Sequence, residues 1–383
     1  MHLVTAALAV LTLLFLVLLT IELMRAAGII RRLVDIPTVA DSWPRVSIVI
    51  AARNEERNIE KALQSVLGLD YPDLEIVFVN DRSTDRTAEI VERVSRRDPR
   101  LHLETITTLP DGWLGKNHAL HVGAGRADGE LILFTDADIV FEPTTLRRAV
   151  VYMKSETLDH LTAGGDVSGP TLPLRMFIGA FAFFFVLYAR PWRARNPRSA
   201  DHVGIGAFNL VRATTYRSAG GHQPIAMRPD DDMKLGKLLK KAGARQAFIG
   251  AVGFISVEWY TSVADAIKGL EKNSFSAVNY SVSLLIVATS AQLAFYTWPF
   301  LALFLTRGWI LACNAAIVSI LLILVGALAA QSGSKAWYAL AFPFANLLFI
   351  YILWRSSLMT LSAGGIRWRD TFYPLAALRA NRI

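Results

Sequence analysis

The stretch LILFTDADIV at residues 131–140 guides the interpretation of the whole chain. Four β-forming residues precede two aspartates one residue apart, Asp136 and Asp138, so an apolar strand ends in a carboxylate pair. Ligands of open α/β sheets bind beyond the carboxyl ends of the strands, and hard cations such as Mg²⁺ or Mn²⁺ prefer carboxylate oxygens. The pair therefore indicates a site for a divalent metal and a diphosphate. Taken alone, however, an Asp-x-Asp sequence favours the alternative in which one aspartate caps a turn and the other is solvated.

The composition indicates a membrane protein. Of the 383 residues, 53% are hydrophobic and 19% are charged, and the mean hydropathy is +0.37. The net charge of +8, with many arginines beside hydrophobic segments, suits a domain that rests on anionic lipid. Nucleic acid is not an expected partner, because no stripe of Lys and Arg is interleaved with aromatic residues. The single cysteine, Cys313, excludes a disulfide framework and a thiol metal cluster.

Apolar segments at both ends bracket a more polar middle. Residues 3–21 have the length of a spanning helix, about 20 residues, and they lack the basic flank and cleavage site of a signal peptide. Arg25, Arg31 and Arg32 follow, which predicts that the next domain is cytoplasmic. The expected segments are a transmembrane helix at 1–25, a linker at 26–44, an α/β domain at 45–260, a juxtamembrane amphipathic segment at 261–280, about three transmembrane helices at 281–354 and a basic tail at 355–383.

Two features of the membrane topology stay open. The apolar run between Arg175 and Arg190 has 14 residues, short for a span, so residues 174–189 are interpreted as an interfacial helix, with a buried core helix as the alternative. Three spans near 281–305, 309–330 and 336–354 would put the basic tail opposite the α/β domain. Because this conflicts with the positive-inside tendency, either one span is re-entrant or the tendency fails here.

The middle of the chain predicts a sheet built from strand-loop-helix units. The strand at 46–51 and the strand at 75–79 are each followed by polar residues and a helix, the second beginning near Thr84, and a third strand is expected at 101–106. This order is typical of a mostly parallel sheet that binds a nucleotide. No Gly-x-Gly-x-x-Gly follows the first strand, which argues against a dinucleotide fold.

Further candidate site residues lie in loops. Lys116 follows Gly112 and Gly115 at the start of a helix, where it would either meet phosphate or be an ordinary solvated lysine. Residues 204–212 predict a strand, and His222 in the next loop is either a substrate contact or a structural histidine. Three acids at 230–232 open a helix, which is more than capping requires, so one of them is a candidate general base.

Four separated motifs resemble the family 2 glycosyltransferases with the GT-A fold over about residues 45–260. They are AARNEE at 51–56, VNDRSTDRT at 79–87, TDAD at 135–138 and DDMKLG at 231–236, the last following Gly220 and Gly221. The flanking topology, the GWLGK loop and the terminal GGIRWRDTFYPL resemble a membrane-bound subgroup that includes hopene-associated and diaponeurosporenoate (carotenoid acid) glycosyltransferases. The resemblance implies a mixed, mostly parallel nucleotide-sugar-binding sheet with flanking helices, together with one N-terminal and about three C-terminal transmembrane helices.

The resemblance also implies roles for individual residues. Donor-binding residues would be Ala52, Arg53, Glu55, Asp81, Lys116 and Asp136, with Asp81 accepting a hydrogen bond from the base and Asp136 on the ribose side. Asp138, with Asp136 beside it, would bind Mg²⁺ or Mn²⁺ on the diphosphate. Asp232 would be the general base, with Asp231 next to it as a further catalytic residue. Two departures from the family pattern are visible, Asp231 in place of Glu and Asn80 in place of Asp.

The expected function is therefore metal-dependent, inverting transfer of a sugar from a nucleotide donor, UDP-glucose or a relative, to a lipid acceptor of isoprenoid, carotenoid or hopanoid type. The protein would be a multi-pass protein of the cell membrane with its catalytic domain on the cytoplasmic side. A processive polysaccharide synthase is the enzymatic alternative, weakened because residues 269–275 read GLEKNSF where a Gln-x-x-Arg-Trp motif would stand. A membrane scaffold with a degenerate nucleotide domain is disfavoured by the presence of Asp136, Asp138 and Asp232.

Overall fold

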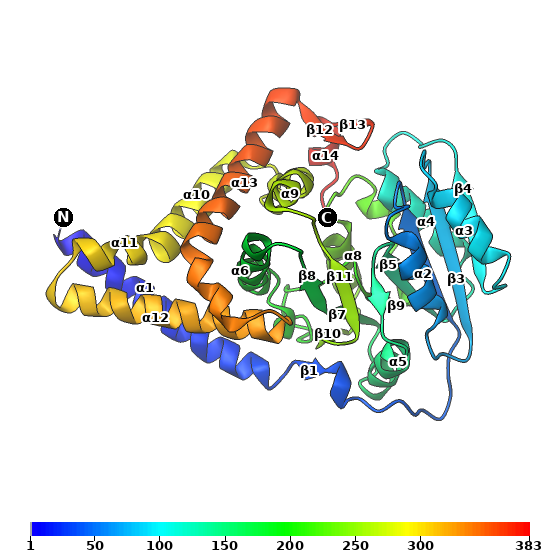
Figure 1. The fold of residues 1–383 in the computed structure, drawn as a ribbon, viewed down its shortest axis with the longest axis horizontal. Helices are drawn as coiled ribbons and strands as arrows, with labels where there is room; N and C mark the ends of the chain where they lie inside the picture. The colour runs from blue at the N-terminus through cyan, green and yellow to red at the C-terminus, as the bar shows by residue number, and fades with distance from the viewer. Residues whose placement is uncertain (1) are drawn as a thin grey trace. The chain divides into compact units, whose positions relative to one another are not determined.

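The computed structural model describes residues 2–383 and divides into two compact units, each assembled from segments far apart in the sequence (Figure 1). The sheet unit consists of Ile30–Asp166, Ala189–Val257 and Ala376–Ile383. The helical unit consists of the residues up to Ile29, Val167–Tyr188 and Glu258–Leu375. The last residues of the chain thus belong to the sheet unit, although a long helical segment separates them from the rest of it.

An eight-stranded mixed sheet forms the centre of the sheet unit. Its order is β1 (Arg31–Arg32), β10 (Gln246–Gly250), β7 (His160–Gly164), β9 (Asn209–Arg212), β5 (Leu131–Asp136), β2 (Val46–Ala52), β3 (Leu74–Asp81) and β4 (Leu101–Ile106). β9 runs antiparallel to both of its neighbours, whereas the other neighbouring pairs are parallel. The predicted fold class, a mixed and mostly parallel sheet with flanking helices, is confirmed.

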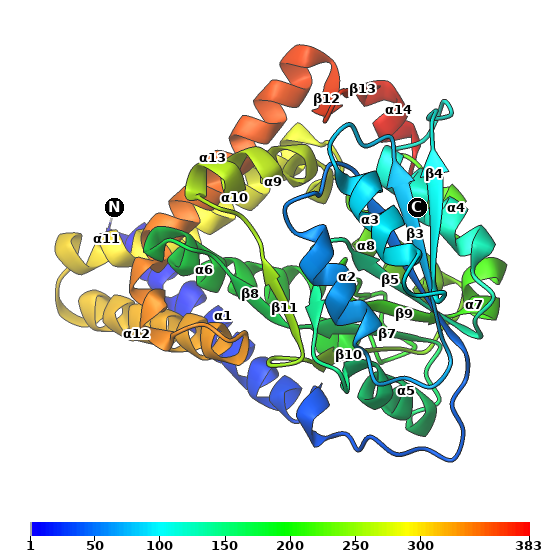
Figure 2. The ribbon, with the colours of Figure 1, turned by 45° about the vertical axis from the view of Figure 1, so that its right-hand side comes forward.

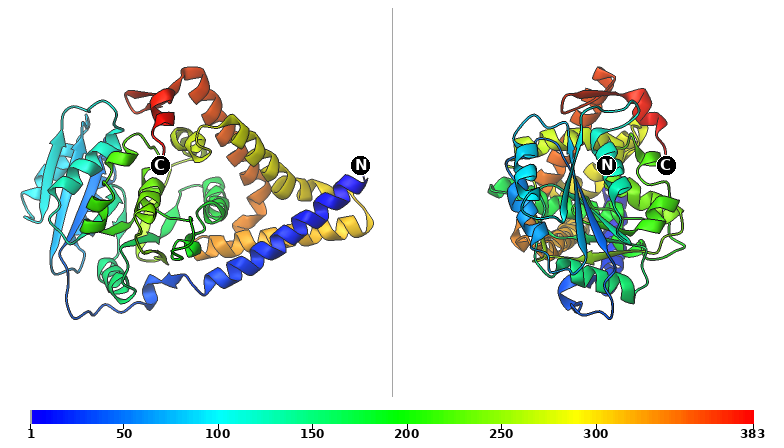
Figure 3. Two further views of the ribbon diagram at one scale, coloured as in Figure 1. Left: turned by 180° about the vertical axis from the view of Figure 1, so that it is seen from behind. Right: turned by 90° about the vertical axis from the view of Figure 1, so that its right-hand side faces the viewer.

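Helices cover both faces of this sheet (Figures 2 and 3). They are α2 (Ile59–Leu67), α3 (Thr87–Ser95), α4 (Gly115–Arg126), α5 (Thr145–Ser155), α7 (Ala213–Ser218) and α8 (Asp231–Lys241). The central strands are apolar without alternation because both of their faces are buried. Ile48 packs in one core with Leu63 of α2, and Val49 packs in a second core with Leu120 of α4. Gly123 lets α4 approach closely, because a Cβ there would lie 2.5 Å from Val49 Cγ1.

The helical unit contains the long apolar helices. They are α1 (His2–Ala27), α6 (Leu172–Ala189), α10 (Val282–Gln292), α11 (Trp298–Leu305), α12 (Gly308–Gln331) and α13 (Phe342–Ala363), and the amphipathic α9 (Val263–Ala277) precedes α10. Within the described residues, five segments are long and apolar enough to cross a membrane. They are His2–Ala27, Leu172–Arg193, Val282–Leu305, Gly308–Gln331 and Ala336–Ala363, which confirms the expected N-terminal and C-terminal membrane helices.

Two elements differ locally from the sequence-based expectation. The helix after β3 begins at Thr87 instead of near Thr84, and in the turn before it the Thr84 N–H donates to Asn54 Oδ1 over 2.8 Å. The strand expected at 204–212 begins only at Asn209. Residues 204–208 form a loop instead, and Gly204 lies so close to α8 that a Cβ would come 1.9 Å from the Asp232 carbonyl oxygen.

Candidate active site

The carboxyl ends of β2, β3 and β5 place three of the predicted residues at one edge of the sheet. Because these strands are parallel and adjacent, Ala52, Asp81 and Asp136 lie at the same edge of the sheet, and the register places Asp81 and Asp136 on the same face. Asp136 lies in register with Ala51 of β2, and its N–H donates to the Gly206 carbonyl over 3.0 Å. Asp138 follows in the turn after β5 and is half-buried. Carboxylates from separate strands therefore lie at one edge of the sheet.

The loop after β2 lies against the turn after β3. The Glu55 N–H donates to Thr87 Oγ1 over 2.8 Å, and the Asn54 N–H donates to Ser83 Oγ over 3.0 Å. These bonds hold Arg53 and Glu55, both predicted to line a donor pocket, next to the end of β3. They also explain why Asn54 adopts a left-handed conformation with φ of 57°.

Asp81 is buried at the end of β3, and both of its carboxylate oxygens accept hydrogen bonds from the Arg82 guanidinium, over 2.7 and 3.0 Å. The first residue of α4 is packed against this pair. A Cβ on Gly115 would lie 2.4 Å from Asp81 Oδ2, so glycine is required for the contact. The GWLGK loop and the Asp81 motif are thus parts of one site.

Lys116 joins the two acidic clusters that the sequence presented separately. Its Nζ lies 2.7 Å from Asp136 Oδ1 and 3.4 Å from Asp231 Oδ2. Burial by itself would lower the pKa of Lys116, but the charges of Asp136, Asp231 and Asp232 together outweigh it and the pKa is raised. Lys116 is therefore a fixed ammonium group between carboxylates, and the alternative of an ordinary solvated lysine is wrong.

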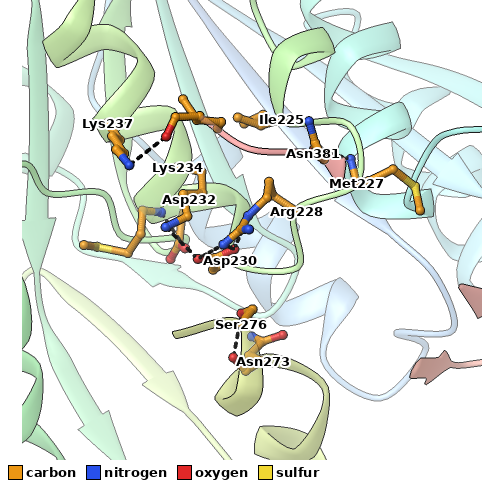
Figure 4. A network of polar contacts seen from close by, with 12 residues as sticks. Ile225, Met227, Arg228, Asp230, Asp232, Lys234, Lys237, Asn273, Ser276 and Asn381 are labelled. Carbon is orange, nitrogen blue, oxygen red and sulfur yellow. Dashed lines mark hydrogen bonds and ion pairs between the residues drawn. The ribbon is translucent and has the colours of Figure 1, made fainter. Parts of the chain in front are cut away.

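The three acids at the start of α8 have different environments, and Figure 4 labels two of them, Asp230 and Asp232. Asp230 binds the Arg228 guanidinium through both oxygens, over 2.9 and 3.0 Å, and lies 3.2 Å from Lys234 Nζ. Its charge is thereby neutralised locally. Asp231 faces Lys116, and Asp232 accepts hydrogen bonds from two backbone N–H groups, Gly206 over 2.9 Å and Met233 over 2.7 Å. Asp232 is thus the acid of the three that is held by backbone instead of by a cation.

The electrostatics separate the carboxylates further. Burial, reinforced by the neighbouring charge of Asp231, raises the pKa of Asp232 to about 7. Burial, followed by the charges of Asp136 and Glu55, likewise raises the pKa of Asp138 to about 7. A carboxylate whose pKa lies near neutrality is suited to accept a proton in a reaction.

Four of the charged side chains, Lys116, Asp136, Asp231 and Asp232, line one small pocket. His222 belongs to the wall of this pocket and is buried, and its Nδ1 lies 2.7 Å from the Tyr216 hydroxyl oxygen. Burial lowers the pKa of His222 to about 3, so the ring is neutral. Of the two interpretations that the sequence left open, the structural role of His222 fits this environment.

Gly206 is a site residue that the sequence-based interpretation missed, since residues 204–212 were expected to be a strand. Its N–H donates to Asp232, and its carbonyl accepts from the Asp136 N–H, so it connects the two acidic clusters through backbone. Its Cα also faces Asp136 closely, since a Cβ there would lie 2.4 Å from Asp136 Oδ2. The paired glycines of the GIG sequence at 204–206 were the available signal, because close backbone approach requires glycine.

We expect Gly206→Ala to reduce activity strongly, because the added methyl group would displace the Asp136 carboxylate or open the Gly206 bond to Asp232. Overpacking of this kind costs about 1–3 kcal/mol of the free energy of unfolding. Gly125→Ala is the matched control, since a Cβ at that helical position meets no atom within 4 Å. Enzymatic assay and thermal unfolding of both variants check this expectation, and Gly206→Ala with the activity of Gly125→Ala would contradict it.

The sheet, its flanking helices and the acidic edge together define a GT-A fold. The structure of a mannosyltransferase from Pyrobaculum calidifontis, in complex with GDP-Man and Mn²⁺, is similar with a TM-score of 0.53 and 20% sequence identity, covering 93% of this chain and 98% of that chain. Residues 47–214 match the model of the family described as "Glycosyl transferase family 2". The chain therefore contains a domain of glycosyl transferase family 2.

Two curated relatives are similar over part of the chain. A 4,4'-diaponeurosporenoate glycosyltransferase of Staphylococcus aureus (strain USA300) is 31% identical over 183 residues, 46% of this chain and 46% of the relative. A beta-monoglucosyldiacylglycerol synthase of Synechocystis sp. (strain PCC 6803) is 35% identical over 121 residues, 31% of this chain and 25% of the relative. The matched part thus spans less than half the length of each relative.

The donor set at the end of β5 fits a hard divalent cation only in combination with a substrate. Within residues 2–383, no group of three or more His, Cys, Asp or Glu side chains is arranged to hold a metal ion. Asp136 and Asp138 nevertheless offer two carboxylates, and the raised pKa of Asp138, caused first by burial and then by Asp136 and Glu55, reflects negative charge that a cation would relieve. Mg²⁺ is commonly held by one or two carboxylates, with phosphate oxygens and water completing its shell.

Proposed function

We propose that this protein is a metal-dependent, inverting glycosyltransferase that moves one sugar from a nucleotide-diphosphate donor, UDP-glucose or a similar UDP-sugar, to a lipid in the membrane. One observation carries the proposal: Lys116 contacts both Asp136, at the end of β5, and Asp231, at the start of α8. Asp232 lies beside them, and these residues lie within or near the part of the chain that matches family 2. The pocket thus contains charged groups for the leaving diphosphate and a separate carboxylate for the acceptor.

In this proposal the two halves of the site do different work. Ala52, Arg53, Glu55 and Asp81 line the nucleotide side at the ends of β2 and β3, and Asp136 lies towards the ribose. Lys116 attracts the diphosphate. Asp138, with Asp136, would hold Mg²⁺ or Mn²⁺, which neutralises charge on the departing diphosphate when bound.

Asp232 removes the proton from the acceptor hydroxyl as that oxygen attacks the anomeric carbon from the face opposite the leaving group. Asp231 keeps Lys116 in place and raises the pKa of Asp232.

The long apolar helices of the helical unit support a lipid acceptor, because an enzyme with a soluble acceptor would not require them. The names of two relatives also refer to membrane lipids or to a carotenoid acid. We therefore propose an isoprenoid, carotenoid, hopanoid or glycerolipid-like acceptor with a free hydroxyl or carboxyl group. We place the transfer at the cytoplasmic leaflet of the cell membrane in this proposal, which the basic residues after α1 support.

Connectivity supports an interfacial position for α6. The strands before and after it, β7 and β9, pair directly with each other, with His160 opposite Val211. The segment after α6 is also tied to the sheet unit, since Lys240 Nζ donates to the Ala194 and Asn196 carbonyls. If α6 crossed the membrane, the chain would have to return through hydrocarbon without regular structure, which unsatisfied backbone groups forbid. We therefore retain the interfacial helix, although its length and composition would permit a span.

The tail supports an even number of crossings after the catalytic domain. Residues 376–383 belong to the sheet unit, so the chain must end on the side from which it entered. Three apolar segments lie in between, and one of them therefore does not cross completely. We propose that this segment is 336–363, because its Arg355 is ion-paired with Glu271 of the amphipathic α9. With this segment crossing only in part, the basic tail would lie on the same side as the sheet unit.

The pH dependence of the reaction should reflect the raised pKa of Asp232. A general base acts only when deprotonated, so a pKa of about 7, raised by burial and then by Asp231, predicts that kcat/KM rises with pH through about 7 and levels off above it. The profile of kcat/KM is the appropriate measurement, because it reports groups of the free enzyme. A profile that is flat between about pH 5.5 and 8 would contradict the role of Asp232 as the base.

The direct test is transfer of radiolabelled sugar by the purified full-length protein in vesicles that contain extracted membrane lipids. We expect label from UDP-glucose, with GDP-mannose as a comparison donor, to appear in the organic phase and to depend on added Mg²⁺ or Mn²⁺. Chromatography of the product should show one sugar per lipid. A ladder of long products would favour a processive polysaccharide synthase, and label only on soluble acceptors would contradict the lipid proposal.

A further inference from the structure

The segment at 224–228 links the pocket wall to the catalytic helix. It begins within a short 3₁₀ turn, Gln223–Ile225, and leads through Pro229 and Asp230 to the first turn of α8. Most of it belongs to no helix or strand, so its backbone N–H and C=O groups need partners from elsewhere. Two asparagine side chains, one in α4 and one near residue 383, supply partners for several of these groups.

Asn117 holds the segment from the side of α4. Its side chain is completely buried, and its Nδ2 lies 2.7 Å from the Ile225 carbonyl oxygen and 2.9 Å from the Arg228 carbonyl oxygen. The N–H of Leu114, just before α4, also donates to the Ala226 carbonyl over 2.8 Å. Since Asn117 directly follows Lys116, the same turn of helix that binds Asp231 also fixes the chain that leads to it.

Asn381, one of the last residues of the sheet unit, also binds the segment at 224–228 (Figure 4). Its Oδ1 accepts from the Met227 N–H over 2.9 Å, and its Nδ2 donates to the Pro224 carbonyl over 2.8 Å. Both ends of this amide are therefore used. Nearby, Lys237 Nζ of α8 donates to the Ile383 carbonyl oxygen over 2.8 Å, and Ile383 packs against the core that contains Leu235 and Leu239. The tail thus contacts both the segment and the helix that follows it.

A displacement of this segment would be transmitted to the carboxylates. Arg228, at its end, is buried and binds Asp230 through two hydrogen bonds, so the chain between them is rigid. Asp231 and Asp232 follow immediately in the first turn of α8. Their positions relative to Lys116 and Gly206 consequently depend on how firmly the preceding segment is held. A shift of about 1 Å in a reacting group can reduce a rate by about 100-fold.

We propose that Asn381 is a positioning residue: with Asn117, it clamps residues 224–228 so that Asp231 and Asp232 are held in their catalytic positions. The inference rests on the proposed function, because it assigns Asn381 a role through those carboxylates. The end of the basic tail, to which the sequence analysis assigned no role in the site, thereby supports the catalytic carboxylates. Asn381 touches no substrate in this account.

The test compares Asn381→Ala, which removes both hydrogen bonds, with Asn381→Asp, which keeps the acceptor for the Met227 N–H and loses the donor to Pro224. Arg382→Ala is the matched control, because it truncates the exposed neighbouring side chain on the same tail. We expect kcat per folded enzyme to fall about 10- to 100-fold in Asn381→Ala, and less in Asn381→Asp, while the donor KM changes less than about twofold. Arg382→Ala should match the wild type.

Hydrogen exchange provides a second readout that does not depend on activity. Peptides covering residues 224–232 should exchange faster in Asn381→Ala than in the wild type, with little change in the strands of the sheet. Unchanged exchange there, or an unchanged kcat, would overturn the inference. A loss of activity that only follows a loss of folded protein would also overturn it, since that is a structural role. A wild-type protein without any sugar transfer would instead contradict the proposed function, and with it the catalytic meaning of the clamp.

Discussion

The variant Asp232→Asn should transfer sugar about 10²- to 10⁴-fold more slowly than the wild type, the range attributed to a positioned general base. The amide has the size of the carboxylate, but its single oxygen can keep only one of the two hydrogen bonds that Asp232 accepts, from Gly206 at Oδ2 and from Met233 at Oδ1. It cannot accept the proton of the acceptor hydroxyl. Donor binding should be preserved, because Lys116 and the carboxylates at the end of β5 are untouched. Transfer kinetics and donor titration on the same preparation measure the two effects separately.

Asp41→Asn is the matched control for this change. Asp41 is exposed in the segment before β2, so its conversion to an amide changes the net charge equally without affecting the pocket. It should retain wild-type kcat. Asp232→Asn with near wild-type kcat would remove Asp232 from the role of base. A parallel loss of donor affinity would instead assign Asp232 to the donor side of the site.

Of the substitutions proposed for the pocket, Lys116→Met should lower the free energy of unfolding the most. It leaves Asp136, Asp231 and Asp232 close together without the ammonium group that now lies between them. Breaking a buried ion pair in this way costs about 3–5 kcal/mol. We expect the lower end of that range, about 3 kcal/mol, because the side chains of Lys116 and Asp136 are 25% and 38% exposed. Donor binding should also be lost, since the diphosphate loses its cation.

The destabilisation by Lys116→Met should depend on pH in a defined direction. Without the lysine, the pKa values of Asp231 and Asp232, already raised by burial, rise further above those of the unfolded chain. Carboxyl groups of this kind stabilise the fold when protonated and lose that contribution as pH rises through the folded pKa. The difference in Tm between variant and wild type should therefore be larger at about pH 8 than at about pH 5.5.

Lys61→Met on the exposed side of α2 is the control for the loss of a lysine, and its Tm should follow that of the wild type at both pH values. A Lys116→Met protein whose Tm deficit is the same at the two pH values would show that Lys116 does not balance the charge of the carboxylates. A full wild-type Tm would exclude the buried pairing altogether.

The sequence predicted the fold well where local chemistry is consistent with the tertiary structure. Apolar strands that end in polar residues, at Asp81 and Asp136, indicated a parallel sheet and its functional edge, and the sheet topology confirms the fold class. Long uncharged runs indicated membrane helices for a similarly direct reason, since only continuous helix satisfies the backbone in lipid. Boundaries were less accurate: the last long helix continues to Ala363, beyond the expected 354.

The relations between distant segments could not be predicted from local patterns. The ammonium group of Lys116 joins acids that lie more than 90 residues apart along the chain, and Asn381 reaches a loop 154 residues before it. Such contacts are set by how the sheet and helices close on one another. Gly206 was missed for the opposite reason: its apolar neighbours fitted a strand, and only the proximity of Asp136 and Asp232 reveals why a loop with glycine is needed.

The most direct test of the account is the anomeric configuration of the product formed by the purified protein from an α-linked nucleotide sugar in lipid vesicles. If Asp232 is the base and the diphosphate leaves from the opposite face, near Lys116, the configuration at the anomeric carbon is inverted. The product should therefore carry a single β-linked sugar on the lipid, which NMR of the extracted glycolipid can identify. An α-linked product, or the absence of sugar from the lipid fraction under conditions where the donor binds, would contradict it.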